Sequence, residues 1–266
     1  MKRKAYSSDL TQAQFKRLEP LLPAAKPGGR PRTACPVREV LCAVMYVLQG
    51  GIAWRNLPHD FPAWQTVYSY FRRFEGDGSW EAINRVLVRE TRKAAGRDPE
   101  PSAGIMDAQT VRCAPQAGPR GVDAGKKTNG RKRHILTDTM GLLLVVLITT
   151  GNIQDRDGGK MTLLYARRRF VRLRHVWADG GYLGKLVSWT LETLGWTLEI
   201  VKRSDKAKGF QLLPRRWVVE RSLAWLTRSR RLSRDYEGRC HTSAAWCYLA
   251  NIRLMLRRLD PSAEPL

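Results

Sequence analysis

Three acidic residues lie where a carboxylate is costly to bury unless a cation accompanies it. Asp107 falls inside an apolar stretch with the length of a strand. Asp179 ends a second apolar stretch, directly before two glycines, where the backbone must turn and a ligand can approach closely. Glu220 is the one acid between positions 215 and 234, a segment that also holds seven arginines. These positions make the three carboxylates candidates for a shared chemical task.

Three carboxylates from separate elements, set among arginines and lysines, suit phosphoryl transfer on a polyanion. Two Mg²⁺ ions held by oxygen ligands, about 3.5–4 Å apart, can activate the attacking oxygen and stabilise the leaving one. Without metal ions, the carboxylates would repel the phosphate. The sequence therefore predicts that Asp107, Asp179 and Glu220 are catalytic and bind Mg²⁺, for which Mn²⁺ would substitute.

Glu220 also has a simpler interpretation. Its segment lacks Gly and Pro and is predicted to be a helix, on which Arg216 lies one turn before the acid. An ion pair between these two side chains would explain the carboxylate without a metal ion. Apolar residues flank the face that carries Glu220, which predicts that the acid is partly buried.

Other residues could take part in metal chemistry. Four further aspartates are rival metal ligands: Asp123, Asp138, Asp155 and Asp157. Asp138 comes nearest to the site if its strand and the next form a hairpin, and Asp155 follows the third predicted strand. The four histidines are scattered and form no metal motif with the five cysteines. The sequence contains no phosphate-binding glycine loop and no nucleophile-elbow motif.

The charge of the chain indicates the class of its partner. Among 266 residues there are 47 Lys and Arg against 24 Asp and Glu, a formal net charge of +23. An excess of this size is typical of proteins that bind nucleic acid. The longest apolar run, residues 142–148, is too short to span a membrane, so no membrane association is expected. Unpatterned cysteines favour reduced thiols in a cytoplasmic protein.

The first 95 residues are predicted to form a small all-α domain. A capping box at Thr11-x-x-Gln14 starts a short helix. Three more helices follow, joined by tight turns, near residues 37–48, 67–74 and 79–93. With outward basic residues such as Arg72 and Arg73, these helices fit a helix-turn-helix-like module, although a plain helical bundle would have the same pattern.

A basic turn separates the first two of these helices. It runs Lys26-Pro27-Gly28-Gly29-Arg30-Pro31-Arg32 and cannot be helical. Arg30 and Arg32 could enter the minor groove of DNA, or the segment could be an ordinary basic turn.

A polar, proline-bearing linker at 96–103 is predicted to precede a second domain, residues 104–266. Five strands are predicted in it, at residues 104–111, 134–138, 142–149, 175–182 (ending in a glycine turn) and 196–201. Helices are predicted at 158–173, at 183–194, around Glu220 and at 240–259, and a basic loop at 112–133. The pattern predicts an α+β or α/β domain with a mixed five-stranded sheet flanked by helices.

Several motifs, taken in chain order, resemble those of bacterial insertion-sequence transposases of the Asp-Asp-Glu (DDE) class. In the N-terminal region the similar motifs are Gly29-Arg30-Pro31-Arg32, Gly51-Ile52-Ala53-Trp54-Arg55-Asn56-Leu57-Pro58 and Trp64-x-x-Val67-Tyr68. In the C-terminal region they are Gly125-Lys126-Lys127-x-x-Gly130-Arg131-Lys132-Arg133-His134, Ala178-Asp179-Gly180-Gly181-Tyr182 and Arg216-Trp217-Val218-Val219-Glu220-Arg221. The resemblance covers nearly the whole chain, and the occurrence of all these motifs in this order makes it specific.

The resemblance implies an RNase H-like catalytic domain with a triad of metal-binding acids. Asp107 would lie on the first strand, Asp179 after the fourth strand and Glu220 on the following helix. Related transposases carry a Tyr-(2)-Arg-(3)-Glu-(6)-Lys signature around the glutamate, and here Arg216 and Glu220 fit it. Two signature positions differ, at Leu213 and Thr227, and either Arg228 or Arg231 could take over the contact of the missing lysine.

The resemblance also implies a function, that of a DNA transposase. The helical domain would bind the terminal inverted repeats of the element, water would cleave the phosphodiester at its end, and the freed 3′-hydroxyl would attack target DNA. The partners would be double-stranded DNA and a second copy of the chain, in the cytoplasm of a bacterium at the nucleoid. Contacts with DNA are expected from Arg30, Arg32, Arg72, Arg73, Lys126, Lys127, Arg131, Lys132, Arg133, Arg216, Arg228 and Arg231.

Two other classes of function remain open. A repressor or a domesticated remnant would bind DNA without needing Mg²⁺ or the three acids. A structure-specific nuclease with the same fold would cut DNA that lacks inverted repeats. The complete set of motifs and the intact triad favour the transposase.

Overall fold

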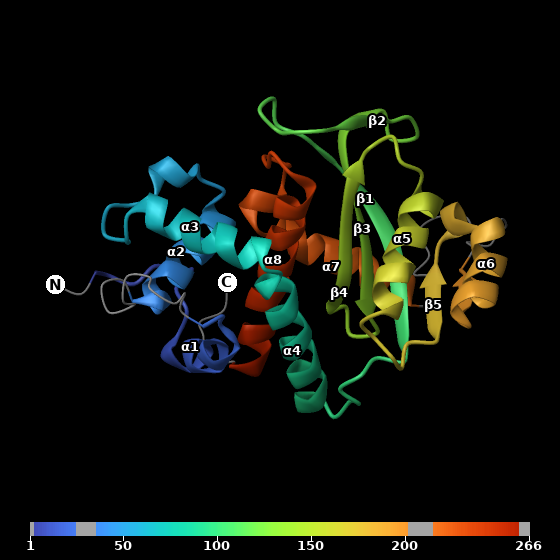
Figure 1. Ribbon diagram of the computed structural model, residues 1–266, viewed down its shortest axis with the longest axis horizontal. Coiled ribbons are helices and arrows are strands. Elements are labelled where there is room, and N and C mark those ends of the chain that lie inside the picture. The colour runs from blue at the N-terminus through green and yellow to red at the C-terminus, as the bar shows by residue number, and fades with distance from the viewer. Residues whose placement is uncertain (1–2, 25–35, 202–214, 261–266) are drawn as a thin grey trace.

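The computed structural model of the chain describes residues 3–24, 36–201 and 215–260 (Figure 1). The predicted minor-groove arginines, Arg30 and Arg32, lie outside the described residues, as does Leu213. None of the described helices is both long and apolar enough to cross a membrane.

The N-terminal region is helical, as predicted. Helix α1 (Gln12–Leu18) begins at the capping box, where Thr11 accepts a hydrogen bond from the backbone N–H of Gln14 at 3.1 Å. Three longer helices follow, α2 (Val37–Gly50), α3 (Trp64–Gly76) and α4 (Ser79–Ala94). Single 3₁₀ turns lie between them, η1 (Glu19–Leu21) and η3 (Trp54–Asn56). Helix α2 ends where Gly51 adopts a left-handed conformation, a common way for a helix to stop.

A mixed sheet forms the other half of the molecule. Its strands are β1 (Ala103–Arg112), β2 (Gly121–Asp123), β3 (Thr128–Asp138), β4 (Leu143–Thr150), β5 (His175–Ala178) and β6 (Thr197–Ile200). The sheet has the order β4-β3-β1-β5-β6. Strand β3 is antiparallel to both β4 and β1, whereas β1, β5 and β6 run parallel to one another. The predicted mixed sheet of five strands preceded by a helical region is therefore confirmed, with the short β2 added beside β3.

The predicted basic loop at 112–133 is wrong in its second half. Residues 128–133 belong to β3, which pairs with β1 from Gly130 onward, so that Arg131 lies opposite Val111 and Lys132 opposite Thr110. Side chains alternate between the two faces of a strand, and both faces of this sheet are covered. Three basic residues that would be exposed in a loop are thus carried into the interior.

Helices cover both faces of the sheet (Figure 1). Helix α5 (Asp155–Arg167) packs on β3 and β4 and covers the face of His134, whose ring lies against Gly158. Helix α7 (Arg216–Thr227) covers the opposite face, where Ser222 and Trp225 approach Ile135. The remaining helical segments are η4 (Gly180–Tyr182), α6 (Lys185–Trp189), the π-helical turn η5 (Thr190–Leu194), η6 (Arg230–Leu232) and α8 (Cys240–Leu259).

Helix α8 lies between the N-terminal helices and the sheet (Figure 1). Trp246 of α8 stacks on Phe71 of α3 with ring centroids 4.4 Å apart, and Asn251 donates a 2.6 Å hydrogen bond to Asn84 of α4. The C-terminal helix thus joins both halves in one apolar core. The division at 96–103 stays a prediction, although the segment between α4 and β1 coincides with it.

Candidate active site

Three elements bring the predicted acids to one end of the sheet. Asp107 lies in β1 opposite Ile135, on the face that α7 covers. Asp179 follows β5 and caps η4, where its Oδ1 accepts a 2.9 Å hydrogen bond from the N–H of Gly181. Glu220 lies in the second turn of α7, which packs on β1. Because β1 and β5 run parallel with Ile105 paired to Trp177, the middle of β1 and the residues just after β5 are neighbours.

Arg216 lies among these acids. Its Nη2 atom is 3.4 Å from Oε1 of Glu220 and 3.7 Å from Oδ2 of Asp179. Its charge also lowers the pKa of Asp107. One guanidinium in the first turn of α7 therefore interacts with all three acids.

The environment of Asp107 disfavours its charge. The pKa of Asp107 is raised to about 6, chiefly by burial and also by the nearby charge of Asp179, while a hydrogen bond from the N–H of Ala108 opposes the increase. Arg216 and Lys126 act in the opposite direction. Carboxylates that repel each other in this way gain most from a shared cation.

Glu220 differs from what its sequence predicts. The expected partial burial is wrong, because 55% of its side-chain surface is exposed. The ion pair with Arg216, the simpler interpretation of this acid, is present at 3.4 Å. An exposed pair one helical turn apart stabilises a helix only weakly. The pair therefore leaves Glu220 free to serve another ligand.

The acids do not form a closed metal site in this arrangement. Within residues 3–24, 36–201 and 215–260, no three His, Cys, Asp or Glu side chains are close enough together to hold a metal ion. The donor set nevertheless fits Mg²⁺, because it consists of carboxylate oxygens, two of which repel each other. Arg216 currently supplies the positive charge beside these acids.

Three of the basic residues expected to contact DNA are buried by ion pairs and hydrogen bonds inside the protein. Arg131 donates from Nη1 to Oδ1 of Asp235 at 3.0 Å, and its side chain is 0% exposed. Arg133 donates to the carbonyl oxygen of Leu232 at 2.8 Å. The Lys132 ammonium is also buried, between the carboxylates of Asp123 and Asp155. The expectation of exposed basic side chains at these positions is corrected, because strand pairing buries them.

Arg231 is a fourth correction. It lies in η6 and is buried, with its Nε atom donating to Oε1 of Glu237 at 2.8 Å and its Nη1 atom to the carbonyl oxygen of Ile52 at 3.0 Å. Its guanidinium joins the C-terminal segment to the N-terminal helices, so Arg231 does not replace the signature lysine. Arg228, at the end of α7, is exposed and keeps that possibility.

The other predicted DNA contacts remain accessible. Lys126 and Lys127 are exposed in the turn between β2 and β3. Arg72 and Arg73 are half-buried on α3, where Arg72 pairs with Glu75 and Arg73 donates to the carbonyl oxygen of Ala24 at 2.5 Å. Whether any of these residues binds DNA stays a prediction.

A groove beside the acids contains two arginines that the sequence did not single out. Its volume is about 350 Å³, and it is lined by residues of β1, α7 and η6 with their flanking turns, namely Gln109, Thr110, Val111, Arg112, Thr227, Leu232, Ser233 and Arg234. Thr227, which occupies the signature lysine position, is thus accompanied by Arg112 and Arg234. Arg112 could have been found from its place at the end of the strand that carries Asp107. Arg234 had no comparable signal.

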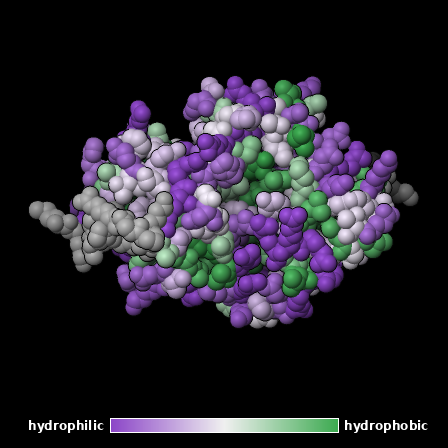
Figure 2. Space-filling view, viewed as in Figure 1, coloured by the Kyte–Doolittle hydropathy of each residue, from purple (hydrophilic) through white to green (hydrophobic). Residues whose placement is uncertain are grey.

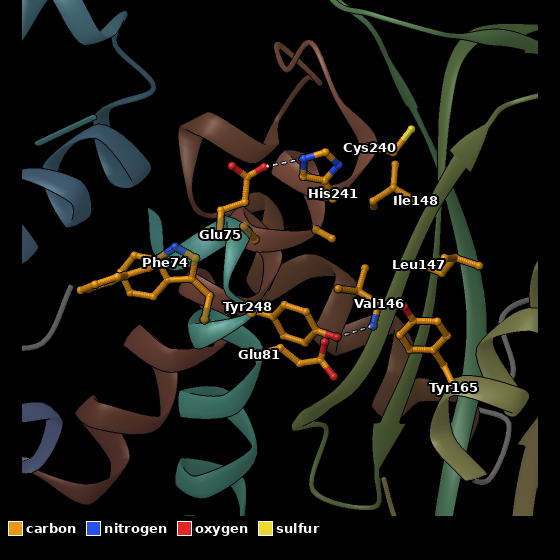
Figure 3. Close-up of a pocket in the computed structure, with 14 residues that line it drawn as sticks. Phe74, Glu75, Glu81, Val146, Leu147, Ile148, Tyr165, Cys240, His241 and Tyr248 are labelled. Carbon is orange, nitrogen blue, oxygen red and sulfur yellow. Dashed lines mark hydrogen bonds and ion pairs between the residues drawn. The ribbon is translucent and has the colours of Figure 1, made fainter. Parts of the chain in front are cut away.

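A second cavity, of about 330 Å³, lies away from the three acids (Figure 3). It is placed where α3, α4 and α8 meet β4, and in Figure 2 hydrophobic side chains gather over this part of the surface. Figure 3 shows Glu75 pointing toward His241, whose Nε2 atom is 3.1 Å away, and Tyr248 accepting a hydrogen bond from the N–H of Val146. None of the predicted triad lines this cavity, which belongs to the junction between the helices and the sheet.

The rival acids have different surroundings. Asp138 is fully buried and pairs with Arg92 of α4, so it joins the two halves of the molecule. Asp123 accepts from Thr110 and lies 3.5 Å from the Lys132 ammonium. Asp157 is exposed on α5. Asp155, in the first turn of α5, differs from these three, because its carboxylate and that of Asp179 border the same space over Gly181.

Comparison with known proteins shows the family of the chain. Residues 98–255 match the family described as "Transposase DDE domain", and residues 10–84 match "Putative transposase of IS4/5 family". The chain is 33% identical over 159 residues to "Putative transposase for insertion sequence element IS402" from Burkholderia cepacia, a match that covers 56% of this chain and 74% of that protein. It is 29% identical over 100 residues to "Insertion element IS402 uncharacterized 16.2 kDa protein" from the same organism, covering 36% and 67% of the two chains.

Solved structures of Mos1 transposase resemble the chain only distantly. The Mos1 mariner paired end complex with Mn is 12% identical, with a TM-score of 0.30 over 92% of this chain and 83% of that one. The Mos1 strand transfer complex is 14% identical, with a TM-score of 0.26 over 91% and 82% of the two chains. These scores are too low to support any conclusion about the site. The family match over more than half of the sequence is decisive, and the chain belongs to the transposases that carry a DDE domain.

Proposed function

We propose that this transposase binds the terminal inverted repeats of its own insertion sequence, cuts the DNA at the ends of the element and joins the freed ends to target DNA. The proposal depends on one observation, the gathering of Asp107, Asp179 and Glu220 around Arg216 beside a groove of about 350 Å³. A gathering of acids and a guanidinium next to a groove suits a reaction at a phosphodiester.

The acids are the groups that would hold the metal ions. Asp107 and Asp179 would share one site, because their charges already act on each other, and Glu220 would contribute from α7. Bound Mg²⁺ would act as a Lewis acid on the scissile phosphate and would favour ionised water as the attacking group. Glu220 is exposed and Arg216 is half-buried, so both side chains have room to reorient.

The remaining residues would position the DNA. In cleavage, the oxygen of water forms a bond to phosphorus and the bond from phosphorus to the 3′ oxygen breaks, which leaves a 3′-hydroxyl and a 5′-phosphate. In strand transfer, that 3′ oxygen forms the bond to a phosphorus of the target, and a target 3′ oxygen leaves. Arg216 would stabilise the negative charge of the phosphate, while Arg112, Arg228 and Arg234 would bind the backbone of the strand along the groove.

Recognition of the element ends would be the task of the N-terminal helices. The positive charge of the chain, +23, is large enough to attract DNA strongly and in a salt-dependent way. Two ends must be cut and joined together, so a dimer of the chain would form the working complex. This assembly would act in the cytoplasm, where the chromosome lies.

The test is cleavage of a duplex that carries one end of the element, taken from the DNA that flanks the gene. With Mg²⁺, the wild-type protein should nick the duplex at the end of the element and then join the 3′-hydroxyl to a second DNA. The Asp107→Asn protein should cut at less than about a thousandth of that rate, because it lacks one metal-binding charge. Asp157→Asn, which changes an exposed acid on α5, is the matched control and should cut normally.

The same assay separates the competing functions. A DNA binder without activity would bind the duplex equally well with Mg²⁺ or with EDTA and would not cut it. A structure-specific nuclease would cut branched or nicked DNA that lacks the element end. Normal cutting by the Asp107→Asn protein would refute the triad.

A further inference from the structure

Tyr182 is a buried residue beside the acids that has no assigned role. Its side chain is 1% exposed, and its hydroxyl has no hydrogen-bond partner within the part of the chain that the structure describes. An unpaired buried hydroxyl costs free energy, roughly 1–3 kcal/mol, so proteins seldom leave one without a purpose. Burial raises the pKa of Tyr182, and the charges of Asp107, Asp155 and Asp179 raise it further. The three carboxylates therefore act electrostatically on the hydroxyl.

Asp155 reaches this place from the face of the sheet that α5 covers. A side chain added at Gly181 would begin 3.0 Å from Oδ1 of Asp179 and 3.9 Å from Oδ2 of Asp155, so both carboxylates border the same small space. Asp107 faces α7, on the other side of β1. Strand β5 ends at Ala178, so beyond this residue it no longer separates the two faces of the sheet. Asp107, Asp155 and Asp179 lie in that region.

Helix α5 approaches the sheet closely at two consecutive glycines, and this approach sets the position of Asp155. A Cβ atom at Gly158 would overlap the ring of His134, and one at Gly159 would lie 2.8 Å from Cε1 of Tyr182. The N-terminal part of α5 therefore rests directly on His134 and Tyr182. Asp155, one turn before Gly159, is held beside η4.

Lys132 orients the Asp155 carboxylate through an ion pair. Its Nζ atom lies 3.0 Å from Oδ1 of Asp155 and 3.5 Å from Oδ2 of Asp123, and its side chain is only 8% exposed. A buried ammonium between two acids holds both side chains in place through ion pairs. The other oxygen of Asp155, Oδ2, is the one that borders the space over Gly181.

We propose that Asp155 and Tyr182 form an outer layer of the cation site, opposite Glu220. Asp155 would add negative charge and orient water beside Asp179, and the hydroxyl of Tyr182 would donate a hydrogen bond to a carboxylate of Asp107 or Asp179. Groups in such a layer fix the orientation of ligands, and their loss typically lowers metal affinity about 10–100-fold. This inference rests on the proposed function, because it requires Asp107 and Asp179 to bind a cation.

The test measures binding of Mn²⁺ to the protein without DNA, from the electron paramagnetic resonance signal of the free ion. The Asp155→Asn and Tyr182→Phe proteins should bind Mn²⁺ at least about tenfold more weakly than the wild type. Tyr182→Phe keeps the ring that Gly159 packs against, so its fold should persist, and circular dichroism checks this. Asp157→Asn should bind Mn²⁺ like the wild type, because its exposed carboxylate is on the same helix but outside the network.

The outcomes separate the inference from the function on which it rests. If Asp107→Asn loses Mn²⁺ binding while Asp155→Asn and Tyr182→Phe bind like Asp157→Asn, the outer layer is refuted and the triad stands. If the wild-type protein binds no Mn²⁺, both proposals fail. Weaker binding by Asp155→Asn and Tyr182→Phe, with Asp157→Asn unchanged, supports the inference, and restored binding by Asp155→Glu would show that the carboxylate is responsible.

Discussion

The Nη2 atom of Arg216, in α7, lies 3.7 Å from Oδ2 of Asp179, an acid that follows β5 and comes 37 positions earlier in the sequence. The same guanidinium pairs with Glu220 and lowers the pKa of Asp107. A permanently charged side chain thus occupies the position in which metal ions would balance the acids. If the acids bind metal ions as proposed, Arg216 would stabilise the site without metal and compete with the metal.

This competition predicts the direction in which a mutation of Arg216 changes the affinity for a metal ion. Without DNA, Arg216→Ala should bind Mn²⁺ about threefold to tenfold more tightly than the wild type, because removing one nearby positive charge strengthens attraction of the cation. Titration calorimetry at low salt measures it. Arg228→Ala, at the exposed end of the same helix, is the control and should change little. Weaker Mn²⁺ binding by Arg216→Ala would show that Arg216 supports the cation instead of competing with it.

The sequence predicted the positions of the acids well, because local rules determine them. Asp107 lies on an apolar strand and Asp179 precedes a glycine turn, and both features depend on neighbouring residues alone. The burial of Arg131 could not be predicted in this way, because its partner Asp235 is 104 residues away. Lys132 raises the same difficulty, since its acids come from β2 and α5. A basic run indicates a DNA contact only if no distant acid pairs with it.

The exposure of Glu220 was misjudged for a related reason. Apolar residues on both flanks of α7 indicated neighbours on both sides, and Val218, Val219 and Leu223 are indeed buried. The face between the flanks, however, is open, so that 55% of the Glu220 side chain is accessible. Periodicity shows which faces are apolar but not whether a polar face between them is covered.

We expect Arg131 to contribute to the stability of the folded protein and not to DNA binding. Arg131→Met would leave Asp235 buried without its cation, and should lower the free energy of unfolding by about 3–5 kcal/mol. Urea denaturation measures this. The Arg131→Met, Asp235→Leu double variant should recover part of the loss, because neither buried charge remains. An unchanged unfolding midpoint for Arg131→Met would contradict the buried pair.

Arg228 should show the opposite behaviour. Arg228→Ala should leave the unfolding free energy within about 0.5 kcal/mol of the wild type, because the side chain is exposed. If Arg228 contacts a phosphate, the slope of log affinity for an element-end duplex against log salt should fall by about one unit. Fluorescence anisotropy between roughly 50 and 200 mM salt measures that slope. An unchanged slope would assign the contact of the missing signature lysine to another residue of the groove.

Gly158 should tolerate no side chain. A Cβ atom there would overlap the His134 ring, so Gly158→Ala must displace α5 or the ring, which we expect to cost about 1–3 kcal/mol of unfolding free energy. Gly76→Ala is the matched control, because Gly76 also lies in a helix and a Cβ atom there would meet nothing within 4 Å. It should be neutral or should stabilise by up to about 1 kcal/mol. Equal effects of the two changes would contradict the close packing of α5.

His134 should make the protein sensitive to acid. Its ring is fully buried against α5, accepts or donates one hydrogen bond with Oγ1 of Thr149 at 2.9 Å, and burial lowers its pKa from 6.5 to about 4. The folded protein therefore binds fewer protons at this residue than the unfolded chain does between those two pKa values. The stabilisation is fully present above pH 6.5 and is lost as the pH falls toward 4, by at most about 3 kcal/mol.

The measurement compares urea denaturation of the wild type and His134→Gln at pH 7 and at pH 4.5. Gln cannot gain a proton, so His134→Gln should lose roughly 2–3 kcal/mol less stability than the wild type between these values, whatever its stability at pH 7. The matched control is His59→Gln, because the side chain of His59 is exposed and its replacement should leave the acid sensitivity unchanged. If the wild type and His134→Gln lose the same stability between pH 7 and pH 4.5, His134 does not remain neutral in the folded protein, and its burial under α5 must be looser than the packing against Gly158 implies.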